Sequence, residues 1–162
     1  MDTATFIALA LACAPQVHPD TARAIASVES GFNPHAIGVV GGELQRQPRT
    51  RAEALSTIDA LQAAGWNYSV GIGQINVGNF ARLGLTPRAA LDPCTSLSAM
   101  QSVLGECYAR AVSSNAGQTA LRFALSCYYS GNFTTGVRHG YVRKVVLASV
   151  AASALPNRKE RS

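Results

Sequence analysis

An acidic residue, Glu29, falls on the apolar face of a predicted helix. The segment 20–30 has apolar residues at helical spacing, at Ala22, Ile25 and Ala26, and Glu29 continues the same face. A carboxylate at such a position is either buried with a partner or lines a cleft. In a cleft, a carboxyl group is suited to general acid and base chemistry.

The position of Glu29 at the end of its helix favours the protonated carboxyl group. Gly31 is predicted to end the helix, and the last turn presents unpaired carbonyl groups and the negative end of the helix dipole. This environment and partial desolvation both raise the pKa of a carboxyl group, as a general acid requires near neutral pH. Two alternatives remain, in which Glu29 pairs with a nearby arginine or is solvated at a frayed helix end.

Four short motifs occur in an order that indicates a known family. Residues 29–36 read ESGFNPHA, residues 71–75 read GIGQI, residues 127–131 read CYYSG, and residues 140–145 read GYVRKV. They resemble, in turn, the ESxFNPxA, GLMQI, AYNAG and YVxxV elements of the soluble lytic transglycosylase (SLT) branch of the lysozyme superfamily. Within this branch, the chain looks most like the VirB1-type transglycosylases of type IV secretion systems.

The resemblance implies roles for the residues that match these motifs. Glu29 would be the single catalytic acid and base, and Ser30 and Gln74 would position groups around the sugar. Tyr128 would lie near Glu29 and donate a hydrogen bond to it.

Further residues of the motifs are implied to contact the glycan. Gly71 and Gly73 would let the backbone approach the sugar, in keeping with the freedom of glycine to make close contacts and to adopt positive φ. Asn76 and Tyr141 are additional candidates for the same cleft. Two positions depart from the family pattern, since Gly73 replaces the methionine of GLMQ and Tyr129 replaces the asparagine of AYNAG.

The acidic residues favour a mechanism with one carboxylate. A conventional glycosidase uses two carboxylates about 5 to 10 Å apart. Of the other acids, only Glu43, in the loop after Glu29, is predicted to face it. The rest lie at termini, at the far end of the same helix, or outside any motif, and they are Asp2, Asp20, Glu53, Asp59, Asp92, Glu106 and Glu160.

The resemblance implies cleavage of the β-1,4 bond between N-acetylmuramic acid and N-acetylglucosamine in peptidoglycan, with a 1,6-anhydro product and no cofactor. Such an enzyme would open the cell wall locally for a type IV secretion or conjugation apparatus, whose components are candidate partners. Two alternatives are a hydrolytic lysozyme in which Glu43 places a water, and a scaffold that binds peptidoglycan without cutting it. His18, His35 and His139 show no metal-ligand spacing, and no nucleic-acid-binding signature is present.

The elements that must position these residues are mainly helical. Periodicity and capping residues predict helices over 3–13, 20–30, 52–64, 76–84, 95–111, 117–129 and 139–153. Asp2 or Thr3 is the predicted N-cap of the first helix, and Asp20 or Thr21 that of the second. The glycine-rich segment 33–52 predicts an irregular loop with one short hairpin, the only β structure expected. The resemblance implies an α+β, mainly α, lysozyme-like fold of the goose and SLT type.

Length and composition fit one globular domain. The chain has 162 residues, 48% of them hydrophobic, and a net charge of +5 carried mostly by arginine, which suits an anionic polymer. We expect a domain over 1–155 and a disordered tail over 156–162. The apolar run after Asp2 lacks a preceding Lys or Arg and is too short to span a membrane, so it is interpreted as a helix. The expected location is periplasmic, with an export signal absent from this sequence.

The four cysteines, at 13, 94, 107 and 127, lack metal or redox spacing and predict two disulfides in an oxidising compartment. Pairing of Cys94 with Cys107 is disfavoured, because one predicted helix carries both about 20 Å apart and a disulfide needs Cα atoms within about 7 Å. The alternative is four buried free thiols.

Overall fold

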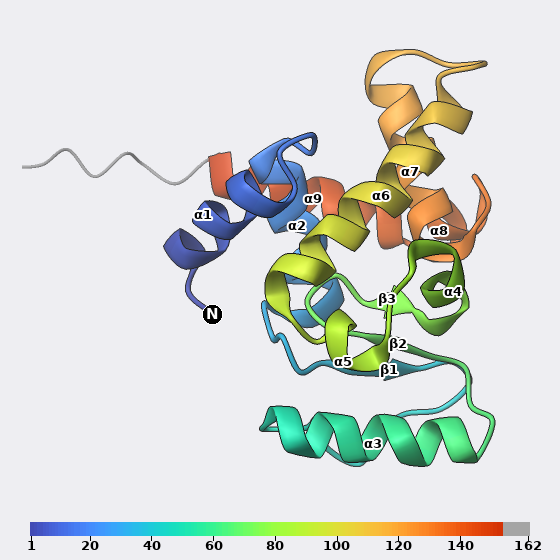
Figure 1. The fold of residues 1–162 in the computed structure, drawn as a ribbon. Helices are drawn as coiled ribbons and strands as arrows, with labels where there is room; N and C mark the ends of the chain where they lie inside the picture. Colours follow the sequence, from blue (N-terminus) through green and yellow to red (C-terminus); the bar gives the residue numbers. More distant parts are fainter. Residues whose placement is uncertain (154–162) are drawn as a thin grey trace, which may run out of the picture.

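The computed structural model describes residues 1–153 (Figure 1). Two helices open the chain, α1 (Thr3–Cys13) and α2 (Pro19–Ser30). Asp2 caps α1 as predicted, its carboxylate accepting a hydrogen bond from the amide of Thr5.

The predicted N-cap of α2 was wrong. His18 is the N-cap, and its Nδ1 accepts from the amide of Asp20. Pro19 occupies the first helical position, where a missing N–H has no consequence, so the helix begins earlier than predicted. Gly31 ends the helix at a φ of 57°, as expected from its position.

A small antiparallel sheet has the strand order β1-β2-β3 and contains β1 (Ile37–Val39), β2 (Tyr68–Val70) and β3 (Ile75–Asn76). The prediction of a hairpin within 33–52 as the only β structure was wrong. Strand β1 pairs with β2, which lies beyond an intervening helix, and β2 and β3 form the hairpin. Side-chain patterning along such short strands did not reveal a partner so distant in the sequence.

The intervening helix is α3 (Arg51–Ala63), capped by Thr50, and Figure 1 shows it on the opposite side of the sheet from most other helices. After β3 come a 3₁₀ turn, η1 (Val77–Asn79), and α4 (Phe80–Leu83), where one short helix was predicted. The next segment, where no helix was predicted, contains another helical turn, α5 (Pro87–Ala90).

The C-terminal half of the described chain is a group of helices. They are α6 (Pro93–Ala111), α7 (Gly117–Ser130), α8 (Thr135–Arg138) and α9 (Tyr141–Ser153). Helix α6 packs against α7 and α1, and α9 packs against α2 (Figure 1). One core cluster joins these helices to the sheet, with Ile25, Ile58, Leu97, Met100 and Val145 among its buried members.

Two disulfides hold the helices together, as the cysteine count predicted. Cys13 pairs with Cys94 and links α1 to α6, while Cys107 pairs with Cys127 and links α6 to α7. The disfavoured pairing of Cys94 with Cys107 does not occur.

The described residues contain no helix both long and apolar enough to cross a membrane. The predicted tail, 156–162, lies outside the described residues.

Candidate active site

A cleft of about 760 Å³ lies between the sheet and the α6–α7 helix pair, with Glu29 in its wall. The sheet side contributes Gly38, Val39, Val40, Asn67, Ser69, Gln74, Ile75 and Asn76. The helical side contributes Asn79, Arg82, Val103, Glu106, Cys107, Arg110, Cys127, Tyr128, Tyr129, Ser130, Gly131 and His139. The lining combines apolar side chains with polar and charged ones.

Glu29 is largely buried in the last turn of α2, and a tyrosine binds its carboxyl group. The hydroxyl of Tyr141 donates to Oε1 of Glu29 over 2.6 Å. Burial raises the pKa of Glu29 from 4.5 to about 7, while the hydrogen bond from Tyr141 opposes the increase. Near neutral pH this carboxyl group therefore exists in both protonation states, as an acid that later acts as a base requires.

The tyrosine that contacts Glu29 is not the one predicted. The hydroxyl of Tyr128 donates to the carbonyl oxygen of Gly73 over 2.6 Å instead of to Glu29. Tyr141 begins α9, which packs along α2, and this packing brings its ring to the end of α2. Burial, and after it the charge of Glu29, raises the pKa of Tyr128, so the electrostatic influence of Glu29 reaches its hydroxyl.

Tyr129, a departure from the family pattern, supports the tyrosine that binds Glu29. Its ring stacks on Tyr141 with centroids 4.6 Å apart, and its hydroxyl lies 3.0 Å from Nδ1 of His139. Neither Tyr129 nor His139 was predicted to act in the site. The available signal was the position of Tyr129 within the motif 127–131, next to Tyr128.

Ser30 and Gln74 organise the backbone around Glu29. The hydroxyl of Ser30 donates to the carbonyls of Ile72, at 2.8 Å, and Ala26, and it is absent from the cleft lining. Gln74 does line the cleft, but its Nε2 donates to the carbonyls of Ala36 and Gly71 at 3.0 Å. Ser30 thus ties the end of α2 to the segment 71–75.

Gly71 and Gly73 were predicted to let the backbone approach the glycan. In the structure, the atom that a Cβ on each would meet first belongs to another segment of the protein. Both are buried outside the cleft lining. Gly71 has a φ of +82°, and a Cβ there would lie 2.5 Å from the carbonyl oxygen of Ala90. A Cβ on Gly73 would lie 3.2 Å from the hydroxyl of Tyr128. Gly73, which replaces the methionine of the family motif, therefore leaves room for the hydroxyl of Tyr128 to donate a hydrogen bond to the main-chain carbonyl of residue 73.

Asn76 is part of the cleft wall, and its side chain organises the sheet edge. Its Nδ2 donates to Oδ1 of Asn67 over 2.8 Å, and its Oδ1 accepts from the amide of Gly78. Gly38 is a lining residue that the sequence analysis missed. A Cβ there would lie 2.7 Å from Oε1 of Gln74.

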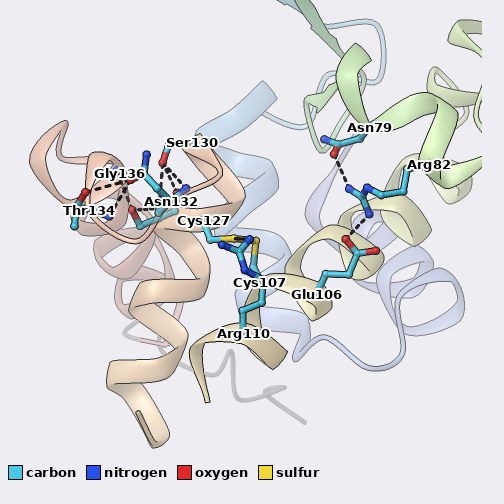
Figure 2. Close-up of a disulfide and its surroundings, with 11 residues drawn as sticks. Asn79, Arg82, Glu106, Cys107, Arg110, Cys127, Ser130, Asn132, Thr134 and Gly136 are labelled. Carbon is cyan, nitrogen blue, oxygen red and sulfur yellow. Dashed lines mark hydrogen bonds and ion pairs between the residues drawn. A yellow bond between two sulfur atoms is a disulfide. The ribbon is translucent and has the colours of Figure 1, made fainter. Parts of the chain in front are cut away.

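The second carboxylate of the cleft is Glu106 and not Glu43. Glu43 is exposed and does not line the cleft. Glu106 pairs with Arg82, whose Nη2 also donates to Oδ1 of Asn79 over 2.6 Å (Figure 2). Glu106 lies three residues after Val103 and four before Arg110, which both line the cleft. This helical spacing was the signal that could have placed Glu106 on the cleft side of α6.

Residues 6–145 match the family model described as the transglycosylase SLT domain. The chain belongs to the SLT transglycosylase domain family. This SLT domain is 50% identical over 151 residues to a type IV secretion system protein virB1 of Brucella suis, a match that covers 89% of the chain and 63% of the relative. It is 45% identical over 148 residues to a protein virB1 of Agrobacterium fabrum, covering 90% and 60%.

A third relative, a protein virB1 of Rhizobium radiobacter, is 42% identical over 151 residues, covering 92% of this SLT domain and 62% of the relative. The chain thus spans about three fifths of the length of the curated relatives it matches. No solved structure gives a significant match.

Proposed function

We propose that this SLT domain is a peptidoglycan lytic transglycosylase in which Glu29 is the single catalytic acid and base. The observation that carries the proposal is the setting of Glu29 in a cleft, with a pKa raised to about 7 and a tyrosine hydroxyl on one carboxyl oxygen. Membership of the SLT family supplies the reaction class.

In the first step, Glu29 donates its proton to the oxygen that joins C1 of N-acetylmuramic acid to C4 of N-acetylglucosamine. The C1–O bond breaks, the N-acetylglucosamine side leaves as an alcohol, and the acetamido group stabilises the electron-poor C1. The tyrosine hydroxyl at Oε1 stabilises the carboxylate that forms on Glu29.

In the second step, the Glu29 carboxylate removes the proton of the C6 hydroxyl of the same muramic acid. The C6 oxygen bonds to C1, giving the 1,6-anhydro sugar and restoring the protonated Glu29. The cycle consumes no water and needs no second carboxylate, metal or cofactor.

The acidic residues around the cleft support this route. Glu43, the residue that a hydrolytic mechanism was expected to use, is exposed and absent from the lining. Glu106 lines the cleft but is held in an ion pair with Arg82. The contact with Arg82 occupies Oε2, one of the two carboxylate oxygens that could otherwise contact a water.

The place of action follows from the substrate and the relatives. Peptidoglycan lies in the periplasm, and two disulfides suit that oxidising compartment. The virB1 name of the relatives, one of them called a type IV secretion system protein, supports local opening of the wall for such an apparatus. Components of that apparatus are the proposed protein partners.

The test is mass spectrometry of soluble products from purified peptidoglycan treated with the wild type, Glu29→Gln and Glu43→Gln. We expect anhydro-muropeptides from the wild type and from Glu43→Gln, and none from Glu29→Gln. Reducing-end products lost in Glu43→Gln would instead establish hydrolysis. Binding of peptidoglycan without products from any of the three would establish a scaffold.

A further inference from the structure

Arg110 is a charged residue of the cleft for which the proposed reaction has no use. It lies in the last turn of α6, it is exposed, and it lines the same cleft as Glu29. None of the ion pairs formed within the described residues involves Arg110. Its positive charge therefore faces the space that the glycan would occupy.

The exposed carboxylate of the cleft, Glu106, is paired with another arginine. Glu106 precedes Arg110 by four residues, a spacing at which opposite charges on a helix commonly pair. In this protein Glu106 pairs with Arg82, which reaches it from α4. Figure 2 shows the two arginines apart, with Glu106 directed to Arg82 and Arg110 lying over the disulfide.

Two contacts hold the Arg110 side chain in place without neutralising it. One Nη lies 3.5 Å from Sγ of Cys127, and the guanidinium lies 5.5 Å from the ring centre of Phe133. The disulfide of Cys107 with Cys127 fixes the surface beneath it. A guanidinium has five N–H donors, so most of them remain available to a ligand.

We propose that Arg110 binds a carboxylate carried by the muramic acid side of the glycan strand. This inference rests on the proposed function, since it places glycan in the cleft. A planar guanidinium matches a carboxylate in bidentate geometry, and the sugars themselves carry no anionic group besides those on the muramyl substituent.

Two sources supply that carboxylate. In peptide-bearing strands it belongs to the stem peptide, and in strands stripped of peptide it is the free lactyl group. The experiment measures the binding of both, and of chitohexaose as a neutral glycan, to proteins that carry Glu29→Gln so that no ligand is cleaved. The matched variants are Arg110→Gln and Arg88→Gln, the latter on an exposed arginine of α5 outside the cleft.

We expect Arg110→Gln to raise the Kd of at least one carboxylate-bearing ligand about three- to tenfold and to leave the Kd of chitohexaose unchanged. Arg88→Gln should change none of them. An effect on peptide-bearing strands alone identifies the stem peptide, and an effect on stripped strands alone identifies the lactyl group. An unchanged Kd for both carboxylate ligands, or an equal loss for chitohexaose, would overturn the proposal.

A second measurement needs no substitution at Arg110. The Kd of the carboxylate-bearing ligand should rise between 50 and 500 mM NaCl, whereas that of chitohexaose should stay constant. Equal salt dependence for the two would count against the carboxylate contact. The two experiments can fail separately. If the wild type makes no anhydro product from peptidoglycan, the proposed function is refuted. The binding measurements can still be interpreted, because their proteins all carry Glu29→Gln and cleave no ligand.

Discussion

Replacement of Glu29 by glutamine removes a buried group whose ionisation opposes folding. Glutamine has nearly the same shape as a protonated glutamate, and its carbonyl oxygen can still accept the hydrogen bond from Tyr141. The variant should therefore keep the native packing and lose only the titration. We predict that Glu29→Gln stabilises the protein in alkaline solution and has little effect in acid.

The size of the effect follows from the pKa of Glu29. Folding raises this pKa from 4.5 to about 7, so the folded state holds the proton more tightly than the unfolded state. The contribution of Glu29 to the free energy of unfolding is therefore fully present below pH 4.5. It is lost progressively as the pH rises to about 7. A pKa difference of about 2.5, at 1.36 kcal/mol per unit, gives about 3.4 kcal/mol.

The assay is urea unfolding of the wild type and Glu29→Gln at pH 4, 5.5 and 8. The variant should gain about 3 kcal/mol over the wild type at pH 8, and about 1.2 kcal/mol at pH 5.5, relative to their difference at pH 4. Glu43→Gln is the control, because it makes the same change of residue type at an exposed position outside the cleft.

A stability difference between wild type and Glu29→Gln that stays constant from pH 4 to pH 8 would refute the reasoning. It would mean that Glu29 ionises as easily in the folded state as in the unfolded one. The acid role proposed for neutral pH would then lose its physical basis.

Three further predictions concern other parts of the structure. Tyr141→Phe removes the hydrogen bond that lowers the pKa of Glu29, so the alkaline limb of the kcat/KM profile should move up by about one pH unit, and an unmoved limb would contradict this. Tyr108→Phe, an exposed tyrosine outside the cleft, is the control. Removing the Cys13–Cys94 disulfide should lower the free energy of unfolding more than removing the Cys107–Cys127 disulfide. The expected losses are about 4.5 and about 3.3 kcal/mol, because the loops that the two disulfides close span 81 and 20 residues. Urea unfolding of the two variants with paired serines tests this order. Gly71→Ala should lower Tm, because the φ of Gly71 is +82° and an added Cβ would meet Ala90. Gly105→Ala should raise Tm, because Gly105 lies on the open face of α6. Equal shifts of Tm in the two variants would contradict the packing argument.

Local patterns in the sequence predicted the longer helices and the place of Glu29 on one of them. Periodicity and capping residues predicted α1 and α3 to within a residue at each end. The same periodicity put Glu29 on a core-facing position, and Gly31 placed it in the last helical turn. These features depend on residues within one or two turns of each other, so the sequence alone carries them.

Only the tertiary structure decided which groups meet Glu29 and what else faces it. The choice of Tyr141 over Tyr128 depends on the packing of α9 against α2, between residues 112 positions apart. The pairing of β1 with β2 across α3 and the turn of Glu106 toward Arg82 are likewise long-range. Residue types predict which groups can form a hydrogen bond, a strand pair or an ion pair. For each such group, however, the sequence offers several partners of a suitable type. The packing of the whole chain brings one of them within reach, and short-range sequence patterns do not contain that information.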